Sequence, residues 1–207
     1  NEQVTEADVI LLFKPHLGLG DCIVQISEYD LPMILFNDEG IVNNPLDALE
    51  YLYPKERVWV AVGYQDVNNY LVALSAKKKM GQTKILILNA EYPHWERFLC
   101  RVHGGREAIR EKLGIELEYV KSENVIGRWE NLDEELVKPI VKRWMTEAEK
   151  VVEPEEKDVI AVAKLYMVMK ELLSEKNAQA ITMAYGENPL PVPCFAYTNL
   201  RDEGIPS

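Results

Sequence analysis

Short apolar runs alternate with longer segments of mixed polarity along most of this chain. The runs are rich in branched and bulky side chains, which is typical of strands buried on both faces of a sheet. We expect such strands at residues 8–13, 31–36, 58–62, 84–89 and 180–185. Residues 115–120 alternate apolar and polar side chains, which predicts a strand with one solvent-exposed face near a sheet edge.

The segments between these runs carry apolar residues at helical spacing. We expect helices at residues 44–53, 66–80, 106–113, 133–152, 158–176 and 194–203. Pro139 is costly inside a helix, so the regular part of the fourth helix is expected to begin near it. In the fifth helix, Lys164, Glu171 and Glu175 mark the predicted outer face, and residues 122–132 are expected to form a loop.

Strands that alternate with helices predict an α/β fold with mostly parallel sheets and helices on both faces. We expect two Rossmann-like lobes: residues 1–57 as the end of a first α/β domain, and residues 58–207 as a second. Residues 58–89 are expected to form one parallel βαβ unit. The strand at 180–185 is expected in the interior of the second sheet.

Composition narrows the class of protein. The chain has 207 residues, of which 47% are hydrophobic and 28% charged, values ordinary for a globular chain with a core. A net charge of −11 argues against nucleic-acid binding, because phosphates are repelled. No apolar run is long enough to span a bilayer, so no membrane partner is expected. Cys22, Cys100 and Cys194 are widely spaced, which indicates free thiols in a reducing compartment and a cytoplasmic protein.

Several motifs have ordinary structural explanations. Gly18 and Gly20 lack the third glycine of a dinucleotide fingerprint, and there is no Walker-type phosphate loop. The lysines at 77–79 fall in the last turn of a predicted helix, where they offset the negative end of its dipole. Trp95 has His94, His103 and two arginines nearby in the sequence, a pattern that suits a polyol or, more commonly, a subunit contact.

The candidate site residue is Glu187. Residues 180–185 predict a buried strand, Glu187 follows it in a turn, and a proline-rich stretch leads to a helix that Gly204 ends. Open α/β sheets bind ligands at the carboxyl ends of their strands, where this carboxylate is expected to lie. An ordinary solvated loop glutamate is the alternative. Cys194, in the first turn of that helix, is expected to be a small buried residue.

This strand, turn and helix resemble those of the L-fucose and L-arabinose isomerases. The resemblance covers the chain in order and is carried mainly by residues 181–204, and more weakly by residues 7–52. It implies an enzyme that interconverts an aldose and its ketose through an enediol. Mn²⁺ or another divalent cation would be bound by Glu187, which is also the implied catalytic residue. The prolines at 189–193 depart from the family pattern.

The same resemblance implies that a second acidic ligand and a histidine lie beyond Ser207. We therefore expect this sequence to be an inactive piece of a longer protein, and it begins at Asn1 rather than at a methionine. The expected partners are a small sugar and further copies of the chain. A module that binds a sugar or another small ligand without chemistry remains an alternative.

The first testable prediction concerns assembly. Trp95, Phe98, Leu99 and Val102 form an apolar stripe in a segment that ends at two glycines, and the family assembles through such surfaces. We expect a homo-oligomer. Light scattering at micromolar concentration should report a mass that is a multiple of the protomer mass, and a monomer alone would contradict the prediction.

Overall fold

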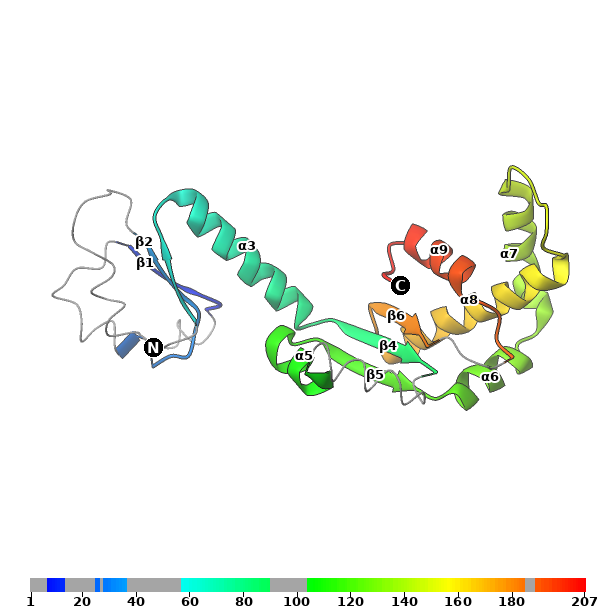
Figure 1. Ribbon diagram of the computed structural model, residues 1–207, viewed down its shortest axis with the longest axis horizontal. Coiled ribbons are helices and arrows are strands. Elements are labelled where there is room, and N and C mark those ends of the chain that lie inside the picture. The colour runs from blue at the N-terminus through cyan, green and yellow to red at the C-terminus, as the bar shows by residue number, and fades with distance from the viewer. Residues whose placement is uncertain (1–6, 14–24, 27, 37–56, 90–103, 185–188) are drawn as a thin grey trace. The chain divides into compact units, whose positions relative to one another are not determined.

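The structure is a computed structural model that describes residues 7–13, 25–26, 28–36, 57–89, 104–184 and 189–207. It is an α/β fold with two parallel sheets, as the alternation of strands and helices predicts (Figure 1). The chain divides into two compact units, Asn1–Ala76 and Lys77–Ser207. The division falls inside a helix, whereas the sequence pattern places a boundary before Val58.

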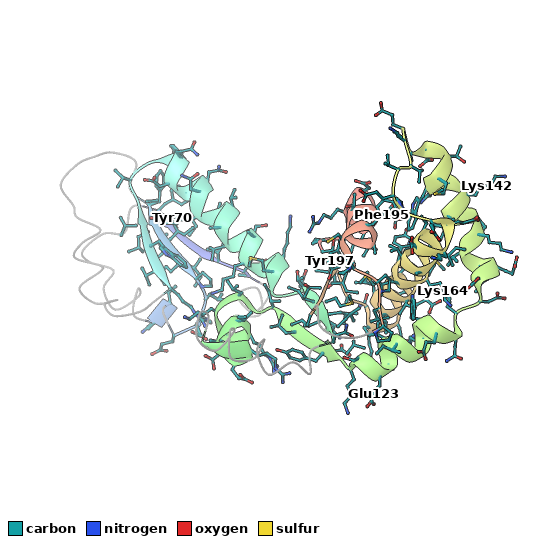
Figure 2. The ribbon with its side chains drawn as sticks, turned by 45° about the vertical axis from the view of Figure 1, so that its right-hand side comes forward. Tyr70, Glu123, Lys142, Lys164, Phe195 and Tyr197 are labelled. Carbon is teal, nitrogen blue, oxygen red and sulfur yellow. The ribbon has the colours of Figure 1, made fainter. Side chains whose placement is uncertain are left out.

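The first unit is built on a parallel sheet of order β1-β2-β3, one face of which is covered by the helix α3. The central strand, β2, has four buried residues and a neighbour on each side. Tyr70 of α3, labelled in Figure 2, stacks on Trp59 and donates a hydrogen bond to the Val60 carbonyl oxygen at 3.3 Å. The elements are β1 (Ile10–Phe13), β2 (Met33–Phe36), β3 (Val58–Ala61) and α3 (Tyr64–Met80).

The second unit is built on a parallel sheet of order β5-β4-β6. From β4 the chain moves outward to β5, and it then returns past β4 to reach β6 on the other side. The elements are β4 (Lys84–Leu88), α5 (Gly105–Leu113), β5 (Glu116–Val120), α6 (Ser122–Asn131), α7 (Glu134–Glu147), α8 (Glu156–Lys176), β6 (Ala180–Met183) and α9 (Cys194–Asp202).

The centre of the second unit is α8, which runs back over the sheet against the direction of the strands (Figure 1). The Trp129 indole of α6 donates to the Ala161 carbonyl oxygen at 2.9 Å, and Trp144 of α7 meets Tyr166 edge to face at 5.4 Å. On its other side α8 packs on alternate residues of the three strands, and these belong to its core cluster: Leu86, Leu88, Val120, Ile181 and Met183. A helix buried on most sides carries apolar residues around most of its circumference, as α8 does between Val159 and Met169.

The opposite face of this sheet carries α5. Tyr119 points away from α8, because its neighbour Val120 belongs to the α8 cluster and side chains alternate along a strand. The Arg106 guanidinium of α5 lies over the Tyr119 ring, 5.4 Å from its centroid. The second sheet therefore has helices on both faces. Among the described helices, none is both long enough and apolar enough to cross a membrane.

Two predictions about strand pairing are wrong. Val58 does not open a second sheet: β3 pairs with β2, so residues 58–89 are not one βαβ unit. The 17 residues of α3 span about 25 Å, roughly twice the length of four-residue β3, which disfavours a compact return to a strand beside β3. The β6 strand lies at an edge of the described sheet and pairs only with β4. Its burial comes from α8, α9 and the chain end, since the Ile181 N–H donates to the Pro206 carbonyl oxygen at 3.0 Å.

Three local predictions also need correction. Residues 122–131 form α6 rather than a loop, with Val125 fully buried. The helix α7 begins at Glu134, before Pro139, because the Asp133 side chain caps it by accepting from the Glu135 N–H at 3.0 Å. Lys164 is 9% exposed, with its ammonium 5.6 Å from the centroid of the Trp129 ring (Figure 2). Its alkyl chain is buried, which a charge pattern cannot show.

A set of glycine substitutions tests the packing of the second unit. Gly114 ends α5 with φ of 75°, and a Cβ there would lie 2.6 Å from the Gly81 Cα. Gly114→Ala should therefore destabilise the protein by more than about 2 kcal/mol. Gly204→Ala should cost about 1 kcal/mol, since Gly204 has φ of 82° in open space. Gly127→Ala, also in open space but inside α6, should stabilise by about 0.5–1 kcal/mol.

Urea unfolding measures the three free energies of unfolding. The order Gly127→Ala, wild type, Gly204→Ala, Gly114→Ala, from most to least stable, is the expected result. A Gly114→Ala variant as stable as Gly204→Ala would show that the close approach of Gly81 and Gly114 does not exist.

Candidate functional site

The carboxyl edge of the second sheet contains a topological switch point. The connection from β4 leads to β5 on one side, whereas β6 lies on the other side of β4. The helices of the two connections cover opposite faces, α5 on one and α6 to α8 on the other. In open α/β sheets, ligands bind outside the carboxyl ends of the strands where the strand order reverses. Here that position is the end of the β4–β6 pair.

Asn89 occupies this position. It follows the last residue of β4, and its N–H donates to the Val120 carbonyl oxygen at 3.1 Å. Its side-chain Nδ2 donates a hydrogen bond of 3.4 Å to the carbonyl oxygen of Ala184, the residue that follows β6. Asn89 is completely buried, yet its Oδ1 has no hydrogen-bond partner among the residues that the structure describes. An amide oxygen left unpaired in a protein interior costs about 1–3 kcal/mol, so it requires an explanation.

Asn89 also has a left-handed backbone, with φ of 56°. Only three of the described non-glycine residues share this conformation, the others being Asp30 and Asn177. Asparagine tolerates positive φ better than most residues, so the conformation explains part of the choice of residue. It does not explain a buried oxygen without a partner.

Tyr197 of α9 lies beside the second half of β6. Its phenol oxygen is buried, near the Thr182 side chain and the Met183 main chain, and it has no hydrogen bond of good geometry to any described residue. Burial raises the pKa of Tyr197, and the groups of Thr182 and Met183 act in the opposite direction. The phenol is therefore protonated at neutral pH, and it can donate a hydrogen bond close to the end of β6.

Most of the site residues predicted from the sequence lie outside the described residues. Glu187 is among them, and β6 ends at Met183, four residues before it. The glycines at 18 and 20 and the whole stretch 90–103, which includes Trp95 and its neighbours, are outside as well. Glu187 as a metal ligand and catalytic residue stays a prediction.

Cys194 is placed as predicted at the start of α9, but it is exposed rather than buried. The buried small residue of this turn is Ala196, which packs into the core in its place. Within the ranges that the structure describes, no three His, Cys, Asp or Glu side chains gather into a group that could hold a metal ion.

A cavity of about 540 Å³ lies at the opposite, amino edge of the same sheet. Its polar groups bond to one another: the Lys84 N–H donates to Gln179 Oε1 at 2.9 Å, and Gln179 Nε2 donates to the Asn177 carbonyl oxygen at 2.8 Å. The loops that follow α3, α5 and α8 all line the cavity, so the negative ends of three helix dipoles face it. The positive charge of Arg110, also in the lining, offsets them. These contacts are those of turns between helices and strands.

A second polar cluster joins α8 to the end of α9. Lys170 Nζ donates to Glu203 Oε2 at 2.7 Å, and the Tyr166 hydroxyl donates to Glu203 Oε1. Lys170, and then Tyr166, hold the pKa of Glu203 below its usual value, while Glu203 raises the pKa of Lys170. Burial is the main cause that raises the pKa of Tyr166. Each group has its partner, so the cluster is a tie between two helices.

Sequence reasoning missed Asn89 as a site residue. The available signal was an asparagine directly after the apolar run Lys84–Leu88, since a polar residue at the carboxyl end of a central parallel strand stands at the ligand edge. Its position in the middle of the sheet, and its lack of a partner, follow only from the pairing of β4 with both β5 and β6.

Glu203→Gln tests the tie between α8 and α9. It should lower the free energy of unfolding at pH 7 by about 0.5–1 kcal/mol, a low figure because water screens a half-exposed pair. The pKa of Glu203 is depressed in the folded protein, so its contribution exists above the ordinary carboxyl pKa and is lost as the pH falls through the folded value. The difference between wild type and variant should therefore shrink below about pH 4.

Asp202→Asn is the matched control, because it changes the charge equally at the adjacent, exposed residue. Urea unfolding from pH 7 down to pH 3.5 provides the measurement. A Glu203→Gln deficit that stays constant over this range, or one equal to that of Asp202→Asn, would exclude the ionic tie.

No protein-family model matches this sequence, and no curated protein shows significant sequence similarity to it. The function is therefore inferred from the chain's own residues and the geometry of its second sheet. The features available are the switch point between β4 and β6, the buried amide of Asn89, and the position of Glu187 in the sequence, four residues after the end of β6.

Proposed function

We propose that this chain is part of a metal-dependent aldose–ketose isomerase, similar to L-fucose and L-arabinose isomerase, that acts on a free sugar through an enediol. Glu187 is the proposed ligand of Mn²⁺ or another divalent cation and the catalytic carboxylate. We further propose a cytoplasmic location, from the free thiols, and assembly into a homo-oligomer.

The observation that supports this proposal most strongly is the position of the carboxyl end of β6. A strand buried by α8 and α9 ends at Met183, at the switch point, and Glu187 follows within four residues. A carboxylate delivered there enters the region where open α/β sheets bind their ligands. A surface glutamate elsewhere on the chain, such as Glu171 on α8, has no such relation to the sheet.

The reaction explains why a carboxylate is needed. Isomerisation moves a carbonyl between adjacent carbons, so a proton is taken from one carbon and returned to its neighbour. A carboxylate in the site can accept and return that proton. The enediol oxygens carry negative charge, and a bound divalent cation stabilises it.

The donor set at this edge suits a hard cation and a polyol. The groups that the proposal assigns to this edge are the Glu187 carboxylate, the Asn89 amide oxygen and the Tyr197 hydroxyl, and none of them is a thiolate. Oxygen ligands favour Mn²⁺ or Mg²⁺ over softer metals. One carboxylate is too few for a tight site, so a complete site needs further ligands, which the proposal assigns to the rest of a longer protein.

The test is a titration of Mn²⁺ into the longest available form of the protein and into its Glu187→Gln variant, combined with an assay of aldose-to-ketose conversion. Glutamine keeps the shape of the side chain and removes its charge. We expect metal affinity to fall at least tenfold, and turnover to fall with it.

Glu171→Gln is the control, because Glu171 is exposed on α8 and the same change there should alter neither quantity. If metal affinity and turnover are unchanged in Glu187→Gln, Glu187 is an ordinary loop residue. If sugars bind to wild type without any conversion, the chain is a binding module rather than an enzyme.

A further inference from the structure

We propose that Asn89 is a substrate-binding residue: its side-chain oxygen accepts a hydrogen bond from a hydroxyl group of a sugar bound at the carboxyl edge of the β4–β6 pair. This rests on the proposed function for the class of ligand. Its evidence is separate, because it depends on Asn89 alone and not on Glu187.

The position of the amide follows from its contacts. Leu88 and Met183 form the last paired rung of the β4–β6 ladder, and Asn89 is the next residue of its strand. Because Nδ2 faces the Ala184 carbonyl oxygen, the amide lies between the ends of the two strands, and the orientation of its oxygen and nitrogen is fixed. Asn89 thus stands at the switch point itself.

The free-energy cost of burying Asn89 Oδ1 without a hydrogen bond supports a role in binding. Oδ1 is completely buried and has no partner within the described part of the chain, and a glycine there would accept the positive φ and avoid the desolvation of a carbonyl group. A ligand hydroxyl that reaches Oδ1 supplies the missing hydrogen bond. The site should then discriminate strongly between a ligand with a hydroxyl at that place and an analogue without one, because the analogue leaves a buried polar group unpaired.

The ligand class follows from the kind of group present. An amide oxygen accepts and does not donate, so it suits a hydroxyl or an amine and excludes an anion such as phosphate. The Tyr197 phenol, buried near Thr182 and Met183, adds a neutral donor near the same strand end. A neutral acceptor and a neutral donor together fit an uncharged polyol.

The amino-edge cavity is the competing location. This cavity has a volume of about 540 Å³, enough for a small ligand, and a polar lining that includes Asn177. Asn177 has φ of 49°, close to the 56° of Asn89, so the two residues form a natural pair for comparison. The same substitution at both positions separates the effect of removing the Asn89 amide from the effect of replacing an asparagine at positive φ.

The experiment uses alditols, which have no carbonyl group and so bind without being converted. Binding of L-arabinitol and L-fucitol in buffer containing Mn²⁺ is measured by calorimetry for wild type, Asn89→Gly and Asn177→Gly. Glycine accepts positive φ in both places. We expect Asn89→Gly to weaken binding of the alditol about tenfold or more, and Asn177→Gly to leave it unchanged.

A second measurement covers the case in which Asn89→Gly does not fold. In ¹⁵N-labelled wild type, the alditol should shift the side-chain amide signals of Asn89 and leave those of Asn177 in place. Equal binding by wild type and Asn89→Gly, unmoved Asn89 signals, or no binding of either alditol to wild type would each overturn the proposal. Aldose conversion by wild type together with any of these outcomes would leave the proposed isomerase function standing.

Discussion

The second unit depends on the burial of α8 between a parallel sheet and three other helices. Leu165, Val168, Met169 and Leu172 have almost no exposed surface, and a fully buried aliphatic side chain contributes about 1.5–3 kcal/mol. This packing holds β6 beside β4 although, among the described strands, β6 has a partner on one side only. The same packing holds α9, through the Tyr166–Glu203–Lys170 cluster and the contact of Trp144 with Phe195 (Figure 2).

The position of the candidate site is a consequence of that arrangement. Because the β5–β6 connection is made of α6, α7 and α8, it covers one face of the sheet and returns the chain to the far side of β4. The strand ends of β4 and β6 then meet where the order reverses, with Asn89 on one and Ala184 on the other. At the amino edge Gln179 is hydrogen-bonded to Lys84 and Asn177, whereas at the carboxyl edge the buried Asn89 Oδ1 has no partner among the described residues.

The sequence predicts the strands and most helices, because the periodicity of hydrophobic residues and the residues that form turns are local properties of the chain. It misses the pairing of β3 with β2 and the edge position of β6 in the described sheet. A fully apolar strand such as Val58–Ala61 has no pattern of side chains that identifies the strand it pairs with. Glu187 could be singled out because it follows a strand. Asn89 also follows a strand, but its unpaired oxygen is a property of the assembled sheet and could not be predicted.

The most direct test of the central claim is the location of the ligand itself. A crystal structure of the protein grown with Mn²⁺ and L-fucitol should show the alditol at the carboxyl ends of β4 and β6, with one hydroxyl within hydrogen-bond distance of Asn89 Oδ1. Alditol found instead in the amino-edge cavity, between Arg110 and Gln179, would contradict the assignment of the site to the switch point.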